Sequence, residues 1–405
     1  MTMAGALDGL RVIDLSRVVA GPLCTRMLAD HGATVVKVEP PAGDELRTYG
    51  PPFGEGTSGY FDGINRGKRH ICLDLSRAAG RDVLRRLLDD ADVVVENFKA
   101  GTMERWGLGY ESSLVRDHPG LVYCRITGFG TDGPLGGAPG YDALLQAFSG
   151  LMTLSGGPDD PPVRIGVPVV DLTAATLAFS GILLALHERT ASGRGQMVDI
   201  ALLDAALSLL HPHAQNWLAH GAAPKRLGDA HAQAAPYQTF QTRTGPVLLA
   251  ANNDRQFAAL AARLGRPDLA DDPRFASNGD RVAHRAELAE ILSGLVAGAD
   301  RASLADDLIR AGVPAAPVNT LPEALAEAQV LHRGLVTGAG RHRELGVSIA
   351  LSRTPGRAHT PPGPRGTDTA AVLGELGYSA ARTAELLRDG TAYQRTACEE
   401  GRTAQ

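Results

Sequence analysis

The chain has 405 residues, of which 44% are hydrophobic and 21% charged, with a formal net charge of −5. This length predicts two or three domains, and the composition is typical of a globular protein that buries a core. No basic run is long enough for a nucleic-acid footprint or a polybasic membrane patch, so neither a nucleic acid nor a membrane is an expected partner.

The first 200 residues alternate between β-like and helical patterns. Helical spacing follows the first predicted strand, where Pro22 suits a first helical turn, and it returns at 79–88. The predicted strands are nearly continuous in apolar residues, which favours a parallel sheet covered on both faces by helices. We predict these strands at 10–16, 34–39, 70–75, 92–98, 121–129 and 196–202.

A long helical stretch at 171–193 ends at Gly193, a predicted helix cap. Its uncharged apolar part, Leu172 to Leu186, is shorter than the roughly 20 residues that cross a bilayer, so we interpret it as a buried helix. A further helical pattern from Leu202 is interrupted near Pro212.

The pattern changes after about residue 222. A hairpin is predicted around Thr244 and Gly245, followed by helices at 254–264 and 281–295. The predicted organisation is a large domain whose N-terminal part spans 1–205, a smaller α+β domain at 225–310, a return to the large domain at 330–393, and a frayed tail at 394–405.

The cysteines favour an intracellular setting. Cys24, Cys72, Cys124 and Cys398 form no CxxC pair, so reduced thiols in a cytoplasm are the expected state. The first 16 residues lack the basic and apolar regions of a signal peptide. We therefore expect a cytoplasmic protein.

Common cofactor motifs fail on their context. GxGxxG strings begin at Gly54 and Gly128, but the first follows no strand and the second is followed by Pro134 and not by a helix. No phosphate loop of the ATPase type and no GxSxG elbow is present. His211 and His213 have no Cys or carboxylate cluster beside them, so no metal is predicted.

Several strings, in this order and spacing, are similar to the class III coenzyme A transferase family, which includes formyl-CoA transferase and carnitine-CoA transferase. The resemblance runs over nearly the whole chain. It implies a Rossmann-like α/β large domain, a smaller domain, and an interlocked homodimer whose rings are formed by linkers near 205–225 and 310–330. The strings are LDGLRVIDLSRVVAGPLCTRMLADHGATVVKVEPPAGDELR at 7–47, NRGKRHICLDL at 65–75, ADVVVENFKAGTMERWGLGY at 91–110, ITGFGTDGPLGGAPGYDALLQAFSG at 126–150, IGVPVVDLTAA at 165–175, GRGQMVDIALLDAAL at 193–207, APYQTF at 235–240 and DPRF at 272–275.

In that family the aspartate of a G-x-P-x-x-D string is the nucleophile, which places the role here on Asp171, after Gly166 and Pro168. The resemblance implies CoA transfer from an acyl-CoA to a small carboxylic acid through aspartyl anhydride and aspartyl-CoA thioester intermediates. CoA is then a substrate, and no permanently bound cofactor is expected. Local sequence alone favours another role, because an Asp before a long apolar helix is a good N-cap.

The family's CoA-contacting positions fall here on Val18, Val19, Leu73, Asn97, Phe98, Arg105 and Tyr141. Three basic residues of the formyl-CoA transferase pattern are replaced, by Pro40, Ser76 and Pro139. Phosphate binding is therefore expected from other groups, with Arg47, Lys68 and Arg69 as candidates. The string around 228–240 is more similar to the branch that uses succinyl-CoA and small dicarboxylic or hydroxy acids.

Three other readings stay open. An α-methylacyl-CoA racemase has a similar fold and a related aspartate, but it uses a histidine of a G-H-D string as its second base. Here that string reads Gly140-Tyr141-Asp142, and a tyrosine with an ordinary pKa near 10 is a poor proton shuttle at neutral pH. The other two readings are a CoA- or nucleotide-binding protein without catalysis, and a dehydratase or hydrolase that uses the acyl-aspartate differently.

Overall fold

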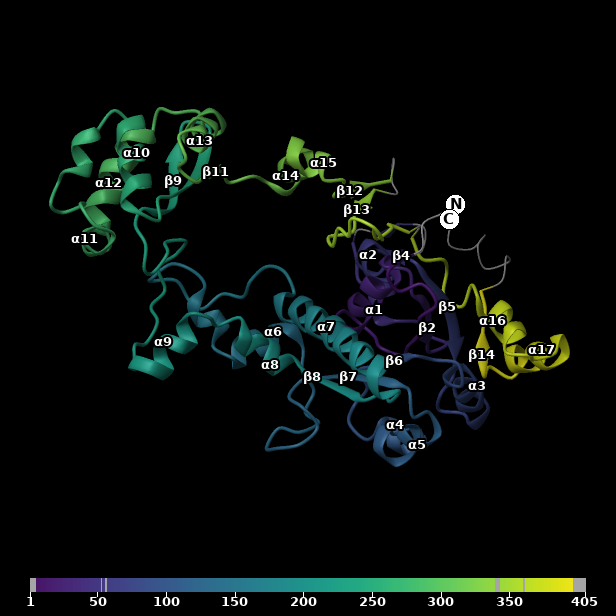
Figure 1. Ribbon diagram of the computed structural model, residues 1–405. Helices are drawn as coiled ribbons and strands as arrows, with labels where there is room; N and C mark the ends of the chain where they lie inside the picture. Colours follow the sequence, from purple (N-terminus) through teal and green to yellow (C-terminus); the bar gives the residue numbers. More distant parts are fainter. Residues whose placement is uncertain (1–4, 52, 55–56, 339–342, 360, 396–405) are drawn as a thin grey trace. The chain divides into compact units, whose positions relative to one another are not determined.

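The computed structural model describes residues 5–51, 53–54, 57–338, 343–359 and 361–395. The chain divides into two compact units, the first made of 1–151, 164–215 and 332–405, and the second of 152–163 and 216–331 (Figure 1). The second unit takes in more of the chain than the predicted 225–310. It includes 152–163 because Gly228 N donates to Gly156 O, and Arg226 Nε donates to Gly157 O.

A seven-stranded sheet forms the centre of the first unit, in the order β14-β5-β2-β1-β6-β7-β8. All neighbours are parallel except β14, which runs antiparallel to β5, so the predicted parallel α/β sheet is confirmed. The strands are β1 (Arg11–Asp14), β2 (Thr34–Glu39), β5 (Lys68–Leu73), β6 (Val93–Glu96), β7 (Val122–Thr127), β8 (Met197–Ala201) and β14 (Ala392–Tyr393).

The chain reverses its direction of winding between β1 and β6. The six parallel strands lie in the spatial order third, second, first, fourth, fifth, sixth, which is the order of doubly wound dinucleotide-binding sheets. In such sheets ligands bind beyond the carboxyl ends of the strands, at the point of reversal. The loops after β1 and β6 are therefore the expected place for a site.

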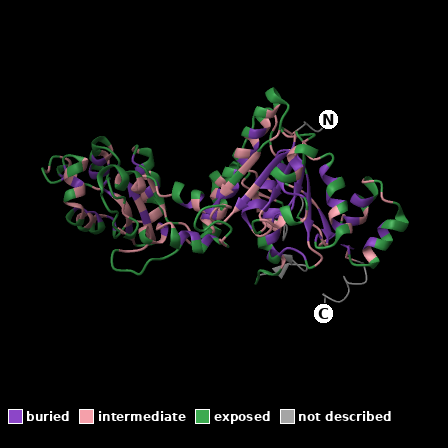
Figure 2. Ribbon diagram, turned by 90° about the horizontal axis from the view of Figure 1, so that it is seen from below, coloured by how far each residue is buried: buried purple, intermediate pink, exposed green. Residues whose placement is uncertain are grey.

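Helices cover both faces of this sheet, and the strands are its most buried part (Figure 2). Alternate residues of β1 enter different cores: Val12 packs with α1 and α7, whereas Ile13 packs on the opposite side with α3 and α17. The helices concerned are α1 (Ala20–Asp30), α7 (Val169–Ser192), α8 (Leu202–Ser208), α3 (Ala78–Leu88), α16 (Thr369–Glu375) and α17 (Ala380–Arg388).

Helix α7 differs from its prediction in two ways. It begins at Val169, two residues before Asp171, so Asp171 lies in the first turn and is not the N-cap. One face, with Leu172, Leu177 and Leu184, is exposed in the single chain, so the helix is only partly buried. By length and composition it could cross a bilayer, a test that core helices of soluble proteins also pass. Its end at Gly193, with φ 72°, agrees with the predicted cap.

The remaining elements of the first unit are short. They are η1 (Glu45–Thr48), β3 (Phe53–Gly54), β4 (Thr57–Ser58), α2 (Gly59–Asn65), α4 (Thr102–Arg105), the π-helical turn η2 (Tyr110–Leu114), α5 (Val115–Asp117), α6 (Asp142–Phe148), β12 (Val336–Thr337) and β13 (Glu344–Leu345). Cys24, Cys72 and Cys124 are buried and free, while Cys398 and the predicted tail from 396 lie outside the described residues. Gln394 is anchored, since its Oε1 accepts a hydrogen bond from Ala370 N.

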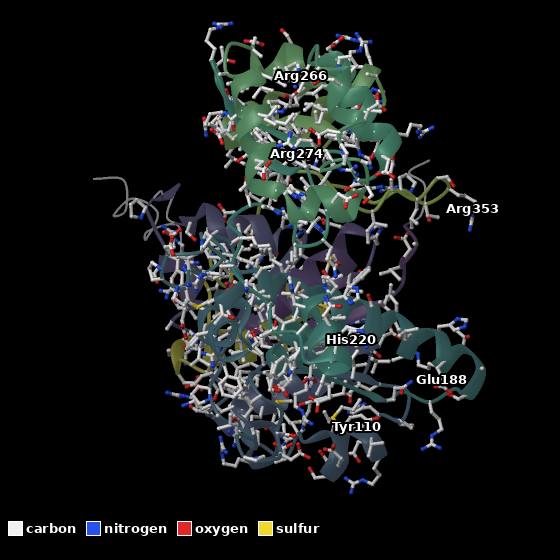
Figure 3. The ribbon with its side chains drawn as sticks, turned by 90° about the vertical axis from the view of Figure 1, so that its left-hand side faces the viewer. Tyr110, Glu188, His220, Arg266, Arg274 and Arg353 are labelled. Atoms are coloured by element: carbon white, nitrogen blue, oxygen red, sulfur yellow. The ribbon has the colours of Figure 1, made fainter. Side chains whose placement is uncertain are left out.

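The second unit packs helices on a small antiparallel sheet of order β11-β10-β9. The hairpin predicted around Thr244 and Gly245 is confirmed, because Thr242 pairs with Gly245. The helix predicted at 281–295 is instead two helices that meet at His284. The first of them begins before residue 281, because a capping box at Ser277 starts it. Arg266 and Arg274, marked in Figure 3, form ion pairs on the surface of this unit.

The strands of this sheet are β9 (Tyr237–Thr242), β10 (Gly245–Ala250) and β11 (Ala315–Pro317). The helices of the second unit and its borders are η3 (Leu151–Leu154), α9 (His213–His220), α10 (Asp254–Arg263), η4 (Pro267–Ala270), α11 (Asn278–Ala283), α12 (Arg285–Val296), α13 (Arg301–Arg310), α14 (Leu321–Ala326) and α15 (Ala328–His332).

Candidate active site

The start of α7 is held by the carboxylate of Asp142, the first residue of α6. Its Oδ2 accepts hydrogen bonds from Val170 N at 2.8 Å and from Asp171 N at 3.2 Å. Its Oδ1 accepts from Gln146 Nε2 at 2.6 Å, and Gln146 Oε1 accepts from Ile165 N at 2.9 Å. Asp142 therefore supplies the helix cap that the sequence assigned to Asp171, which leaves the Asp171 carboxylate unused by the backbone.

Asp171 lies in an environment that resists its ionisation. Burial and, second, the charge of Asp142 raise the pKa of Asp171 to about 7. Among the described residues, none donates a hydrogen bond to its carboxylate that would offset this cost. A helix N-terminus favours the ionised form of an acid, but burial and the neighbouring acid outweigh this effect at Asp171. A shifted pKa of this kind is typical of functional sites.

A cavity of about 260 Å³ opens beside Asp171 at the carboxyl ends of the strands, where the sheet reverses its winding. Four chain segments and three single residues form its wall. They are Arg17–Ala20 after β1, Asn97–Ala100 after β6, 126–128 at the end of β7, 137–141 before α6, and the single residues Glu45, Asp171 and Leu202.

Most of the predicted site residues lie around this cavity. Val18, Val19, Asn97, Phe98 and Tyr141 line it together with Asp171. No histidine is among the described residues that line it. Tyr141 is 62% exposed, which leaves its side chain accessible to a ligand.

The side chain of Asn97 is committed to the backbone of the loop after β1. Its Oδ1 accepts from Arg17 N at 2.8 Å, and its Nδ2 donates to Arg17 O at 2.7 Å. Asn97 thus shapes the wall of the cavity. Phe98 makes an edge-on contact with Trp106, and the guanidinium of Arg17 lies 5.6 Å from the centre of the Phe98 ring.

Leu73 lines a second cavity, of about 200 Å³, beyond the ends of β1, β2 and β5. Arg17 and Phe98 border both cavities, so the two are neighbours along the same edge of the sheet. Arg105 lines neither of them. It is exposed on α4, where its Nη2 donates to Thr102 Oγ1 at 2.8 Å.

The basic residues suggested for phosphate binding are already paired. Arg47 is held by Glu39, Lys68 is buried against Asp14, and Arg69 forms a two-point ion pair with Glu375. The expectation that Lys68 binds a phosphate is wrong, because this residue is only 7% exposed. Among the described residues, Arg17 and Lys99 border the first cavity without forming an ion pair, and sequence reasoning missed both.

Sequence reasoning also missed Asp142 as a partner of Asp171, and Tyr60. Burial, and then the charges of Asp171 and Asp142, raise the pKa of Tyr60, so the phenol lies within electrostatic reach of both acids. The only signal for Asp142 was its place in the Gly140-Tyr141-Asp142 string. Nothing in the local sequence distinguishes Tyr60.

The second glycine string has a structural explanation. A Cβ on Gly128 would lie 2.7 Å from the Cα of Gly140, so these two glycines let the segments that carry them cross beside the cavity. Gly130 and Gly133 have φ of 91° and 75°, which glycine adopts without strain. The string makes loops, in agreement with the rejection of a nucleotide fingerprint.

Comparison with known sequences decides the family, because residues 7–369 match the model of CoA-transferase family III. The chain belongs to this family. A class III CoA-transferase is an enzyme, and the two strings around Asp171 and Asp142 lie within the matched region.

Relatives of this transferase are named for different substrates. It is 41% identical to the succinate–glutarate CoA-transferase of Agrobacterium fabrum over 382 residues, covering 91% of this chain and 95% of that enzyme. It is 38% identical to the acetyl-CoA:oxalate CoA-transferase of Acetobacter aceti, covering 91% and 95%. A solved CAIB/BAIF family protein from Brucella suis is 41% identical, with a TM-score of 0.84 and coverage of 92% and 100%.

Proposed function

We propose that this transferase moves CoA from succinyl-CoA to a small dicarboxylic acid, with Asp171 as the nucleophile. The observation that carries this proposal is the Asp171 carboxylate, which borders a cavity at the reversal point of the sheet while another residue caps its helix. The Agrobacterium relative is named for succinate and glutarate, and this name supports the choice of acids. A carboxylate suits the reaction because it forms both an anhydride and a thioester.

The reaction proceeds by two exchanges on Asp171. Its carboxylate attacks the thioester carbonyl and the carbon–sulfur bond breaks. CoA thiolate departs, and an acyl-aspartyl anhydride is formed. The thiolate then attacks the aspartyl carbonyl, releasing the donor acid as its carboxylate and forming aspartyl-CoA thioester. The acceptor carboxylate attacks this thioester, which expels CoA thiolate and forms a second anhydride. The thiolate then attacks the acceptor carbonyl of that anhydride, which gives the acceptor acyl-CoA and releases Asp171 as its carboxylate. One thioester is exchanged for another, so ATP is not consumed.

CoA is proposed to run along the sheet edge from one cavity to the other. The cavity lined by Leu73 would hold the nucleotide end, and the cavity beside Asp171 would hold the thioester. Arg17 and Phe98 border both, so they would contact the CoA between its two ends.

Replacing Arg17 by Ala should weaken acyl-CoA binding. A charge-assisted hydrogen bond from its guanidinium to a CoA phosphate would be lost, and we expect KM for succinyl-CoA to rise by about 10-fold with a smaller change in kcat. Steady-state kinetics would measure this. Arg105→Ala, at the predicted position that borders neither cavity, is the matched control. A larger KM effect at Arg105 than at Arg17 would contradict the proposed CoA path.

The proposed activity is tested by incubating the protein with succinyl-CoA and a panel of acids, without ATP. Mass spectrometry should show new acyl-CoA species with glutarate or related diacids. Acetyl-CoA with oxalate belongs in the panel, because a relative at 38% identity carries that name. Absence of exchange, together with entry of solvent deuterium at the α-carbon of a 2-methylacyl-CoA, would replace the proposal by a racemase.

We also propose that the enzyme is an interlocked homodimer whose partner subunit completes the site. The helices α6, α7 and α8 contact one another, and each leaves apolar side chains exposed: the leucines of α7, Leu144 and Phe148 of α6, and Leu207 of α8. A second copy of this chain would cover these side chains. We expect sedimentation equilibrium to give twice the chain mass, and Leu184→Glu to weaken the assembly. A monomeric wild-type protein at micromolar concentration would refute the dimer.

A further inference from the structure

The loop after β1, where the cavity beside Asp171 begins, contains a strained residue. Val18 has a φ of 66°, and it is the sole non-glycine residue with a positive φ in the part of the chain that the structure describes. A β-branched side chain rarely adopts this conformation, because its Cβ approaches the backbone. Such strain persists only where the surroundings impose it.

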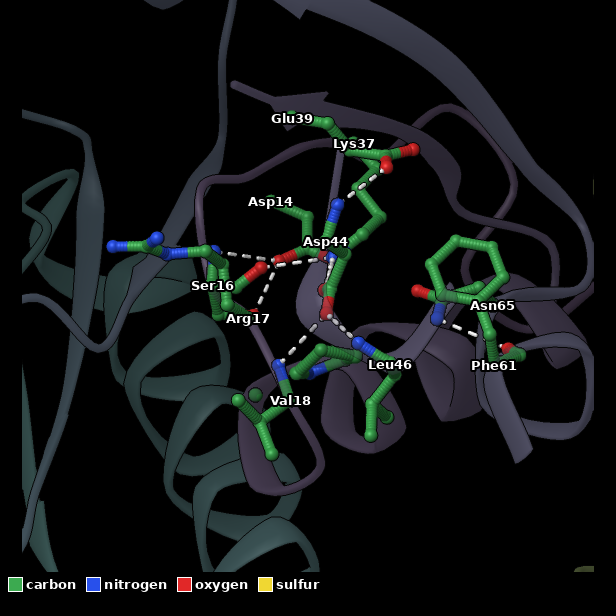
Figure 4. Close-up of polar contacts among 12 residues, drawn as sticks. Asp14, Ser16, Arg17, Val18, Lys37, Glu39, Asp44, Leu46, Phe61 and Asn65 are labelled. Atoms are coloured by element: carbon green, nitrogen blue, oxygen red, sulfur yellow. Dashed lines mark hydrogen bonds and ion pairs between the residues drawn. The ribbon is translucent and has the colours of Figure 1, made fainter. Parts of the chain in front are cut away.

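Buried side chains and the half-buried Asn97 hold three consecutive residues of this loop. Ser16 N donates to Asp14 at 3.0 Å, and Ser16 O accepts from Lys37 Nζ at 2.8 Å. Asn97 binds both the N–H and the C=O of Arg17. Val18 N donates to Asp44 Oδ1 at 3.4 Å, a long hydrogen bond (Figure 4).

The charges behind this loop balance inside the protein. Lys37 Nζ lies 3.0 Å from Asp44 Oδ2, and Lys68 Nζ lies 2.9 Å from Asp14 Oδ2, with all four side chains fully buried. Burial opposes the charge of Lys37, but Asp14 and Asp44 outweigh it and raise its pKa. Lys37 and Asp14 are direct neighbours in the register of β1 and β2. The sheet itself therefore places the ammonium under the loop.

Asp44 connects two parts of the cavity wall. Its Oδ1 accepts from Val18 N and also from Leu46 N at 3.0 Å, where it caps the short helix η1. Glu45, the next residue, borders the cavity together with Val18. One carboxylate thus fixes both segments, and Lys37 fixes that carboxylate.

We propose that the Lys37–Asp44 ion pair is a positioning device that holds Val18 in its strained conformation and so shapes the acyl-CoA cavity beside Asp171. Neither side chain touches the cavity, and both act through the backbone of residues 16–18. The inference rests on the proposed function, because the shape of the loop affects catalysis only if acyl-CoA occupies the cavity.

The test replaces both charges at once by Lys37→Met with Asp44→Leu, since removing one partner would leave a buried charge unpaired. We expect kcat to fall by about 10- to 100-fold, because small displacements of a reacting group have effects of this size. The matched control is Arg66→Met with Asp30→Leu. This pair is also buried, at 2.9 Å, and borders neither cavity, but Arg26 and Glu344 each lose an ion-pair partner with it, so its removal disturbs the fold at least as much. An equal loss of kcat in the control would mean that the Lys37–Asp44 pair only stabilises the fold.

Adding Val18→Gly should rescue the charge-free variant. Glycine adopts a positive φ without a holding interaction, so the cost of removing the ion pair should shrink to less than about threefold when it is measured against Val18→Gly alone. An unchanged cost in that background would overturn the proposal, because it would show no coupling between the ion pair and position 18.

Hydrogen–deuterium exchange separates this inference from the proposed function. In the free protein, removing the ion pair should speed amide exchange at Ser16 and Val18, and the Arg66–Asp30 control should leave it unchanged. If the wild type transfers no CoA but exchange speeds up as expected, the proposed function fails and the positioning role stands. If exchange at these amides is unaffected, the positioning role fails even in an active transferase.

Discussion

Asp171→Ala is expected to abolish CoA transfer, with kcat falling by at least about 10³-fold, because the carboxylate that carries the acyl group and then CoA is removed. The fold should persist. Asp142 supplies the cap of α7, and at position 171 it accepts a hydrogen bond from the backbone N–H and not from the Asp171 side chain. An alanine at position 171 therefore keeps this contact. A thermal melt close to that of the wild type would show this.

The covalent intermediates give a second readout. Wild-type protein incubated with succinyl-CoA and digested under acidic conditions should carry a CoA or acyl adduct on the peptide that contains Asp171, and Asp171→Ala should carry none. Asp142→Ala is an informative comparison, since it removes the other acid of the site and the helix cap together. Full activity of Asp171→Ala would eliminate the anhydride mechanism.

The pH dependence of kcat/KM should show a limb near pH 7. Asp171 must be ionised to attack, and burial together with the charge of Asp142 raises its pKa to about 7. The rate should therefore fall as the pH drops below 7 and reach a plateau above it. Rates of acyl exchange between pH 5 and 9 would measure the limb.

Asp142→Asn assigns that limb to a residue. Loss of the neighbouring charge should lower the pKa of Asp171 and move the limb to lower pH. Burial also raises the pKa of Glu96 to about 7, and this acid binds Phe98 N near the cavity, but Asp142 is not among the groups that shift it. A limb that stays in place in Asp142→Asn would point to Glu96. The variant weakens one contact, since its amide must meet either Gln146 or the backbone of α7.

Local sequence was sufficient for the parallel sheet and for singling out Asp171 as the proposed nucleophile. The hydrophobic pattern along the chain and the turn residues predicted the strands. Strands of a parallel sheet covered by helices on both faces are nearly continuous in apolar residues, so they can be recognised without knowing their order in the sheet. The string at 165–175 singled out Asp171 through its resemblance to a family. Both features depend on residues that are neighbours in the sequence.

Tertiary structure alone decided what surrounds the proposed nucleophile, Asp171. Asp142 lies 29 residues before Asp171, and only the packing of α6 against α7 makes it the helix cap and the neighbour that raises the pKa of Asp171. The strands β1, β2 and β5 also carry charged residues, among them Asp14, Lys37 and Lys68, which read as interruptions of an apolar pattern. Their burial as paired charges depends on how the strands and loops pack, because a buried charge is tolerated only where a partner lies beside it: Lys68 is paired with Asp14 on another strand, and Lys37 with Asp44 in the loop after β2. Periodicity along one segment contains no information about that partner.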